Sequence, residues 1–343
     1  MSIRSIAGLI GLGVVAAMTS LAQVSTAVSK ELRFVHAYPV ASQHHRNVEW
    51  FTEQVTARTN GEVTFRVFPS AQLMPINQEL PAILNGEVAM TYSVAPVAAS
   101  VEPLWGVFDL PFLFDVSLDD TSHGKRFFAS DNGGGMLAKA MEARGFKLIS
   151  IAPTDYPSSV YVTSSNAVEK LEDLKGLKLR SPGGRIGQLA GEAFGYSPVA
   201  IAGAELVPAL SQGVVDGGIL PPIYANDNKL PVKGLNIAPY TWPAVTPIIM
   251  SLEIFQALPE KHQRIMVEVG DELRDRALRV VEENAGKSVD ALKANGATVT
   301  FLSEAESERW REVAQPVWDA FVAENGEAAK AMRDEAIRLR KAE

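Results

Sequence analysis

The sequence predicts an α/β protein built from two similar lobes. Strand-like and helix-like segments alternate over residues 32–93, which is typical of an open sheet with helices on its faces. The same alternation returns over residues 177–217. The chain has 343 residues, of which 47% are hydrophobic, so it is long enough to form two cores.

The first residues, 1–27, are predicted to form a cleavable signal peptide. Arg4 precedes an apolar run over residues 6–18, and small residues follow in 20–22 and 25–27. The run is shorter than the ~20 apolar residues that a membrane span needs, and an uncleaved N-terminal anchor is the alternative interpretation. No later segment is long and apolar enough to span a bilayer. We therefore expect an exported protein that is soluble once the signal peptide is removed.

Charge and composition argue against several classes of function. The net charge is −8, whereas nucleic acids and anionic lipids select clustered Lys and Arg. The chain contains no cysteine, which excludes thiol catalysis, disulfides, zinc–thiolate sites and iron–sulfur clusters. We expect no nucleic acid among the partners.

Each predicted lobe begins with alternating elements. In the first, residues 32–36 and 63–68 read as strands, 47–59 and 77–84 as helices, and 88–93 as a short strand. In the second, residues 177–180 and 198–201 read as strands, 188–194 and 204–211 as helices, and 214–217 as the start of another strand. This order is that of two βαβ-type sheets.

Two seven-residue segments support the likeness of the lobes. Residues 82–88 and 209–215 both combine a helix end, a Gly and a strand start. Gly suits the left-handed position that follows many helices. Chance similarity between ordinary βαβ units is the alternative, because such units are common.

A long helix is predicted from Pro259 to Gly296. Pro suits the first turn of a helix and Gly its end, and apolar residues recur at helical spacing between them. Residues 298–301 then form a strand. Ser303 and Glu306 form a capping box that opens a final helix, which Pro316 is expected to kink.

The motifs of common catalysts are missing. The sequence contains no G-x-S-x-G elbow, no Walker loop and no H-E-x-x-H pair. His45 and Glu49 lie four residues apart and could share a metal, but no third ligand is evident, so a solvated helix end is the alternative. We expect neither a cofactor nor a metal.

Arg180 is the main candidate for ligand binding. It ends the strand 177–180 just before a Pro-Gly-Gly turn, and ligands of open α/β sheets bind at the carboxyl ends of strands. The guanidinium fork matches a carboxylate with two parallel hydrogen bonds. From the residues alone, a surface salt bridge is an equal alternative.

Three motifs carry a resemblance to a known family. They are FDLPFLF at residues 108–114, LEDLKGLKLR at 171–180 and ELVPALSQGVVD at 205–216, with weaker support from 69–73 and 258–260. With these motifs in this order, the chain resembles the dicarboxylate-type solute-binding proteins of tripartite ATP-independent periplasmic (TRAP) transporters, over about residues 32–321.

The resemblance implies an α/β, two-lobed periplasmic-binding-protein-like (type II) fold with the long helix spanning both lobes. Lobe I would comprise residues 28–155 plus about 246–285, and lobe II residues 156–245 plus about 286–343. It also implies a periplasmic protein that delivers a small organic acid to the small and large membrane subunits of a TRAP transporter.

The resemblance also implies a set of ligand contacts. Arg180 matches the family's signature arginine, which holds the ligand carboxylate. A second arginine of the family falls near Ser159, and a family asparagine falls at Leu220, so this pocket is expected to be less polar. The other candidate contacts are His36 at the end of the first strand and the aromatic residues Tyr92, Tyr156, Tyr224 and Trp242.

These departures predict a monocarboxylate ligand, aromatic or a 2-oxo or 2-hydroxy acid. A C4-dicarboxylate or a sugar acid is the alternative within the family. A binding protein of an ATP-driven importer or of a chemoreceptor remains open, as does an exported enzyme on the same scaffold, because fold does not determine function.

Overall fold

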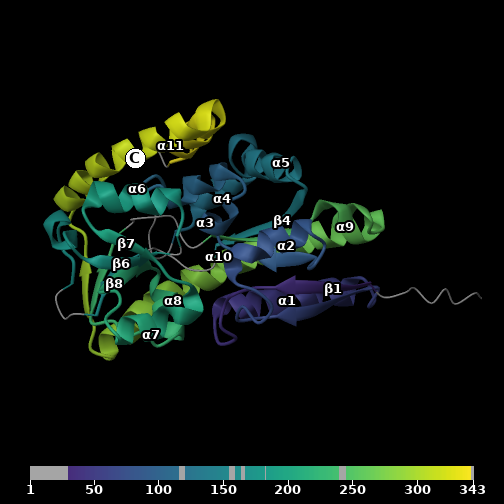
Figure 1. The fold of residues 1–343 in the computed structure, drawn as a ribbon, viewed down its shortest axis with the longest axis horizontal. Coiled ribbons are helices and arrows are strands. Elements are labelled where there is room, and N and C mark those ends of the chain that lie inside the picture. The colour runs from purple at the N-terminus through teal and green to yellow at the C-terminus, as the bar shows by residue number, and fades with distance from the viewer. Residues whose placement is uncertain are drawn as a thin grey trace, which may run out of the picture.

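Two mixed β-sheets covered by helices make up the protein (Figure 1). The computed structural model describes residues 30–115, 120–153, 159–163, 167–181, 183–238 and 245–340. The predicted signal peptide lies outside these residues. The architecture confirms the predicted α/β class with two sheets.

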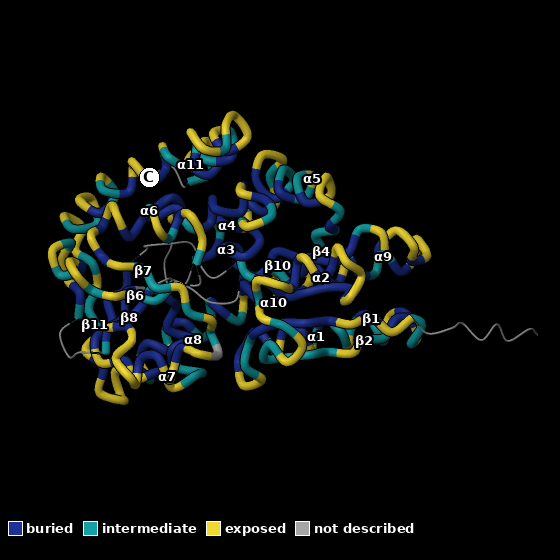
Figure 2. Tube along the Cα trace, viewed as in Figure 1, coloured by how far each residue is buried: buried dark blue, intermediate teal, exposed yellow. Residues whose placement is uncertain are grey.

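The first sheet has the strand order β2-β1-β3-β10-β4. Strand β1 is parallel to β2 and β3, whereas β10 is antiparallel to β3 and β4. Every residue of β10 is buried, and Figure 2 shows this central strand in dark blue. The strands are β1 Lys30–Val35, β2 Val63–Phe68, β3 Met90–Tyr92, β4 Phe146–Pro153 and β10 Val245–Ser251.

The second sheet has the order β11-β9-β5-β8-β6-β7. Strands β6, β7 and β8 are parallel, and β5 runs antiparallel to β8 and β9. The strands are β5 Ser159–Val162, β6 Lys178–Ser181, β7 Ser197–Ala200, β8 Gly217–Leu220, β9 Gly234–Ile237 and β11 Thr298–Phe301.

The helices cover the faces of the two sheets. The α-helices are α1 Gln43–Arg58, α2 Glu79–Leu84, α3 Ala95–Ala98, α4 Ser122–Ala129, α5 Met136–Glu142, α6 Arg185–Phe194, α7 Leu206–Ser211, α8 Pro222–Asp227, α9 Leu252–Gln256, α10 Glu260–Ala294 and α11 Glu304–Arg338. Short 3₁₀ turns include η2 Pro103–Asp109 and η5 Gly203–Glu205.

The repeated helix ends have the predicted geometry. Gly86 follows α2 with φ +74° and Gly213 follows α7 with φ +69°. In both places the next residue donates its N–H to an Ala carbonyl five residues back, Glu87 to Ala82 and Val214 to Ala209. A residue with a Cβ is strained at such φ values, which explains the Gly at both positions.

The long helix α10 contributes to the cores around both sheets. Its 35 residues begin after Pro259 and end before Gly296, as predicted. Met266 and Leu273 pack with strands of the first sheet, whereas Val289 and Leu292 pack with strands of the second. The helix also approaches β4 closely, since a Cβ on Gly270 would lie 2.2 Å from the Ile149 carbonyl oxygen.

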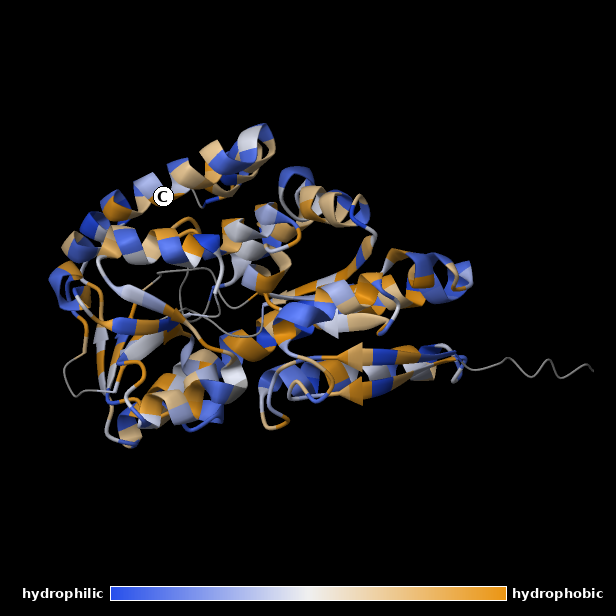
Figure 3. Cartoon of the chain, in the orientation of Figure 1, coloured by the Kyte–Doolittle hydropathy of each residue, from blue (hydrophilic) through white to orange (hydrophobic). Residues whose placement is uncertain are grey.

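The last helix, α11, begins at the predicted cap but breaks at a different place. The Ser303 side chain accepts a hydrogen bond from the N–H of Glu306, as expected. The helical dihedrals are interrupted at Gly326, with φ +71°, and not at Pro316. Pro removes one backbone hydrogen bond, whereas a Gly at positive φ leaves the helical conformation altogether. Figure 3 shows hydrophobic and hydrophilic residues alternating along α11.

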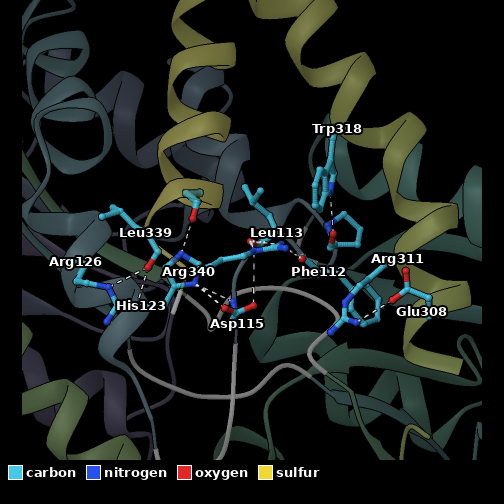
Figure 4. A network of polar contacts seen from close by, with 12 residues as sticks. Phe112, Leu113, Asp115, His123, Arg126, Glu308, Arg311, Trp318, Leu339 and Arg340 are labelled. Atoms are coloured by element: carbon cyan, nitrogen blue, oxygen red, sulfur yellow. Dashed lines mark hydrogen bonds and ion pairs between the residues drawn. The ribbon is translucent and has the colours of Figure 1, made fainter. Parts of the chain in front are cut away.

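The C-terminal end of the chain is held on the loop 110–115 (Figure 4). Arg340 Nη2 donates to the carbonyls of Phe112 and Leu113, each at 2.8 Å, and Trp318 Nε1 donates to the Pro111 carbonyl at 2.8 Å. Arg126 Nη2 donates to the Leu339 carbonyl. The FDLPFLF motif is therefore the buried support of α11, with Phe108 and Phe114 in the core.

Candidate functional site

The carboxyl ends of parallel strands from both sheets carry the candidate residues. His36 follows β1 and Ser93 follows β3 in the first sheet. Arg180 lies near the end of β6, and Leu220 ends the parallel neighbour β8 in the second sheet. This is the edge at which open α/β sheets bind ligands.

Arg180 is half-buried and positioned through one of its nitrogens. Its Nε donates to the Ile201 carbonyl at 2.9 Å. Among the described residues, no carboxylate forms an ion pair with Arg180, and neither Nη group has a hydrogen-bond partner. A guanidinium held in this way can accept a carboxylate on its two Nη groups. The surface salt bridge that the sequence left open is not formed within the described part of the chain.

The charge of Arg180 reaches phenol groups from both sheets. Burial raises the pKa of Tyr38 well above its usual range, and the positive charge of Arg180 opposes this effect. Burial also raises the pKa of Tyr161, again opposed by Arg180. Both phenols are therefore neutral donors near the guanidinium.

Tyr161 is a site residue that the sequence prediction missed. It pairs with Gly218 of β8, and Gly218 pairs with Arg180 of β6, so the three residues form one row across three strands. Directly paired residues point to the same face of a sheet. The Tyr161 hydroxyl is buried and has no hydrogen-bond partner among the described residues.

Gly218 makes room for the Tyr161 ring beside Arg180. A Cβ at position 218 would lie 2.6 Å from the Tyr161 hydroxyl oxygen and 2.9 Å from Cε1 and Cζ. Such distances require the ring to move.

We expect Gly218→Ala to lower the free energy of unfolding by about 1–3 kcal/mol and to weaken ligand binding, because it displaces Tyr161 from Arg180. Thermal unfolding and calorimetric titration would measure both effects. Gly286→Ala is the control, because nothing lies within 4 Å of a Cβ there and α10 should be unchanged or stabilised. Equal affinities of Gly218→Ala and the wild type would contradict this role of Gly218.

Tyr224 of α8 and Leu220 of β8 extend the site along the second sheet. Both are buried and belong to the same hydrophobic cluster as Tyr161. The Tyr224 hydroxyl lies against Gly203, where a Cβ would be 2.7 Å away. This cluster gives an apolar and aromatic surface beside Arg180.

The loop after β1 and helix α1 meet Tyr224 of α8. The His44 ring stacks on Tyr38 with centroids 4.0 Å apart and meets the edge of Tyr224 at 6.0 Å. Nearby, Arg46 Nη2 and Asp227 Oδ2 form an ion pair at 3.0 Å between α1 and α8. A cavity of about 400 Å³ beside this pair is lined by residues of α1, α8 and α10.

Two of the predicted contacts are held mainly by other protein groups. Tyr92 is fully buried, and its hydroxyl accepts a hydrogen bond from Asn47 Nδ2 at 3.3 Å, so it lies behind Tyr38. His36 is also fully buried, and both of its ring nitrogens contact protein atoms.

Three predicted contacts lie wholly or partly outside the described residues. Tyr156 and Trp242 are not among the residues that the structure describes. For Ser159 the structure describes the backbone, which pairs with Leu220.

A buried carboxyl group lies below the end of β3. Glu79 is fully buried, and its Oε2 accepts a hydrogen bond from Thr91 Oγ1 at 2.6 Å. Its Oε1 has no partner among the described residues, and neither has the Ser93 hydroxyl two residues after Thr91. Burial raises the pKa of Glu79 to about 8, so the carboxyl group is protonated at neutral pH.

The described residues contain neither a metal cluster nor a membrane helix. No group of three or more His, Asp or Glu side chains in this part of the chain could hold a metal ion. His45 and Glu49 contact each other instead, with Nε2 and Oε1 3.4 Å apart. No helix among the described residues is long and apolar enough to cross a membrane.

At their strand ends the two sheets carry a guanidinium, aromatic rings and buried hydroxyl groups, an arrangement that can bind a small anion. The chain belongs to the bacterial extracellular solute-binding protein family 7, whose sequence profile matches residues 34–325. This finding confirms the resemblance that the three motifs indicated.

Individual relatives agree with this assignment. The C4-dicarboxylate-binding periplasmic protein DctP of Rhodobacter capsulatus is 27% identical over 298 residues, covering 84% of this chain and 85% of the relative. A TRAP periplasmic solute-binding protein of Desulfovibrio salexigens, solved with bound orotic acid, is 27% identical. Its TM-score is 0.81, and the match covers 90% of this chain and 99% of that one.

A third relative shares the fold. The DctP7 receptor of Bordetella pertussis, which binds pyroglutamic acid, matches this chain with a TM-score of 0.82 at 19% identity. The match covers 90% of this chain and 100% of the receptor chain. The first two relatives are solute-binding proteins, in agreement with the family, and the third shows the shared fold.

Proposed function

We propose that this chain is the exported solute-binding protein of a TRAP transporter, which holds a small monocarboxylic acid on Arg180. The acid is enclosed between lobe I, residues 28–155 plus about 246–285, and lobe II, residues 156–245 plus about 286–343. The loaded protein then delivers the acid to the small and large membrane subunits from the periplasm.

The single observation that carries this proposal is the state of Arg180. Its Nε is fixed on the Ile201 carbonyl, and no described carboxylate neutralises its charge. A half-buried cation without a counter-ion is costly unless a ligand supplies the negative charge. A bound carboxylate meets this need with two charge-assisted hydrogen bonds.

The surroundings of Arg180 support one carboxylate instead of two. Arg46 is paired with Asp227, and Arg276 donates to Asn47 Oδ1 and lies over the Trp50 ring. Tyr161, Tyr224 and Leu220 offer a mostly apolar surface, and the Tyr161 hydroxyl has no hydrogen-bond partner within the described part of the chain. A ring-shaped or 2-oxo or 2-hydroxy monocarboxylate fits this chemistry.

The relatives support organic acids in general and leave room for alternatives. One of them binds C4-dicarboxylates, and two were described with the ring acids orotic and pyroglutamic acid. A C4-dicarboxylate or a sugar acid is thus the second candidate ligand class. An exported enzyme on the same scaffold is the other class, and turnover of a bound acid would reveal it.

A thermal-shift screen tests the proposed ligand class. Orotate, pyroglutamate, 2-oxo acids, succinate, malate and galacturonate would each be added to the mature protein, since a bound ligand stabilises by RT ln(1 + [L]/Kd). We expect the largest rise in Tm with orotate, pyroglutamate or a 2-oxo acid, and a larger rise with galacturonate would favour the sugar-acid alternative. A larger shift with succinate or malate than with any monocarboxylate would favour the dicarboxylate alternative.

A further inference from the structure

A chain of hydrogen bonds connects the solvent to the loop between β1 and α1, residues 36–42, which starts at the buried His36. The Tyr38 N–H donates to His36 Nδ1 at 3.2 Å, and His36 Nε2 lies 3.1 Å from His45 Nδ1. His45 Nε2 in turn lies 3.4 Å from Oε1 of Glu49, whose side chain is 55% exposed. The loop that follows β1 and begins α1 is therefore held by two imidazole rings.

Only one arrangement of protons satisfies this chain. A backbone N–H can only donate, so His36 Nδ1 must accept the Tyr38 N–H and carries no proton. In a neutral ring the proton is then on His36 Nε2, which donates to His45 Nδ1. His45 carries its own proton on Nε2, directed at Glu49.

One additional proton on either imidazole ring breaks the chain. On His36 Nδ1 it would face the Tyr38 N–H, and on His45 Nδ1 it would face the His36 N–H. Exchanging the tautomer of His36 only moves the conflict from one contact to the other. A buried donor left without an acceptor is unfavourable. Consistent with this, burial lowers the pKa of His36 to about 3.

The loop held by this chain forms one wall of the candidate site. Tyr38 donates from its hydroxyl to the Ser93 carbonyl at 3.0 Å and stacks on His44, which meets Tyr224 of the second sheet. The positive charge of Arg180 also acts on Tyr38. Loss of the Tyr38 contact to His36 would disturb the wall that faces Arg180.

The charged and titratable neighbours do not offer an alternative acceptor. Arg180 and Arg46 both disfavour a further positive charge in this region, and Glu79 is protonated at neutral pH. Tyr38, His44, Arg46 and Glu49 surround the two rings from the loop and α1. The groups whose charges act on Tyr38 are Glu79 from α2, Tyr92 from β3, Arg180 from β6 and Tyr224 from α8, and Arg276 of α10 contacts Asn47 of α1.

We propose that the hydrogen-bond chain through His36 and His45 makes ligand binding acid-sensitive: the cleft closes over a carboxylate only while His36 is neutral, so closure releases a proton in mildly acidic solution. This inference rests on the proposed function, because it regulates the same site. His36 is thus a positioning residue for Tyr38.

The first experiment needs no ligand. Histidine-selective ¹⁵N NMR of the mature protein, with the signals assigned from His→Asn variants, reports the tautomer of each ring. At pH 7.5 we expect His36 as the Nε2–H tautomer and a hydrogen-bonded Tyr38 amide, which is lost as His36 is protonated. The Nδ1–H tautomer of His36 would overturn the inference.

The second experiment measures affinity against pH by calorimetry, with whichever of orotate, pyroglutamate or succinate stabilises the protein most. If His36 regains an ordinary pKa of about 6.5 in the open form, affinity falls up to about thirtyfold between pH 7.5 and 5.0. His36→Asn keeps an acceptor for Tyr38 but cannot bind a proton, so its affinity, although weaker, should fall less steeply with decreasing pH than that of the wild type.

A control variant, the pH series and the ligand screen together distinguish a failure of this inference from a failure of the proposed function. His262→Asn removes a histidine that is also buried, at the start of α10, and should keep the pH dependence of the wild type. If the wild type binds an acid with an affinity that does not depend on pH, the inference is overturned and the proposed function is not. Absence of any stabilising acid would overturn the proposed function, and the acid sensitivity with it.

Discussion

Replacing Arg180 with Ala is expected to abolish carboxylate binding and leave the fold intact. Each charge-assisted hydrogen bond to a carboxylate contributes about 1.5–3 kcal/mol, so the loss of two should weaken binding by at least about a hundredfold. The fold should tolerate the change, because the only described hydrogen bond of the Arg180 side chain goes to the Ile201 carbonyl. Calorimetric titration and thermal unfolding of the variant would measure both properties.

Two further variants sharpen this test. Arg185→Ala removes a neighbouring guanidinium that pairs with Glu324 at 2.7 Å on the surface, so binding should be unchanged. Arg180→Lys keeps the charge but loses the planar fork, and intermediate affinity is expected. If Arg180→Ala bound the acid as tightly as the wild type does, Arg180 would have to be removed from the site.

Replacing Glu79 with Gln is expected to stabilise the protein at neutral pH. Burial raises the pKa of Glu79 from 4.5 to about 8, so the folded state holds a proton that the unfolded state releases above pH 4.5. Between these two values, stability falls as pH rises, by about 1.4 kcal/mol per pH unit. At pH 7 the free energy of unfolding of the wild type is therefore lower than at acidic pH by on the order of 3 kcal/mol. The Glu79→Gln variant avoids this decrease because Gln has no proton to release.

The pH dependence of this effect distinguishes it from a change in packing. At pH 4 the carboxyl group is protonated in both states, so the advantage of Gln should vanish. Urea unfolding at pH 4, 6 and 7.5 would measure the difference in the free energy of unfolding between Glu79→Gln and the wild type. The exposed Glu87→Gln on the same segment should show no such trend. Equal stability of the Glu79→Gln variant and the wild type at pH 7.5 would mean that Glu79 is ionised in the folded protein.

Local patterns were sufficient to predict several elements of this fold. Pro259 and Gly296 mark the ends of α10 because first-turn Pro and terminal Gly have local conformational causes. Ser303 caps α11 for a similarly local reason. The likeness between residues 82–88 and 209–215 also reflects the same helix-ending geometry at both places.

Other elements depend on pairing between distant residues. Strand β10 lies between β3 and β4, and its partners are 92 to 160 residues away, from Val245 with Pro153 to Met250 with Met90. Strands β5 and β9 are four residues long and pair with each other antiparallel. No local periodicity indicates such neighbours, so these strands were not predicted.

The same distinction applies to the candidate site. Arg180 could be predicted because a strand end and a Pro-Gly-Gly turn are visible in sequence. Tyr161 could not, since an aromatic residue in a strand usually belongs to the core. The signal lies in the register, which sets Gly218 between Tyr161 and Arg180. His36 was predicted as a ligand contact, and its ring nitrogens instead engage Tyr38 and His45.

The path of α10 restricts how the molecule can move when it takes up a solute. One rigid rod with side chains fixed in both cores cannot lengthen or slide without unpacking one of them. The two halves can therefore move relative to each other only by bending or twisting about the axis of α10. Opening should be widest at the margin farthest from the rod, while the groups beside it, such as Arg46 and Asp227, travel least.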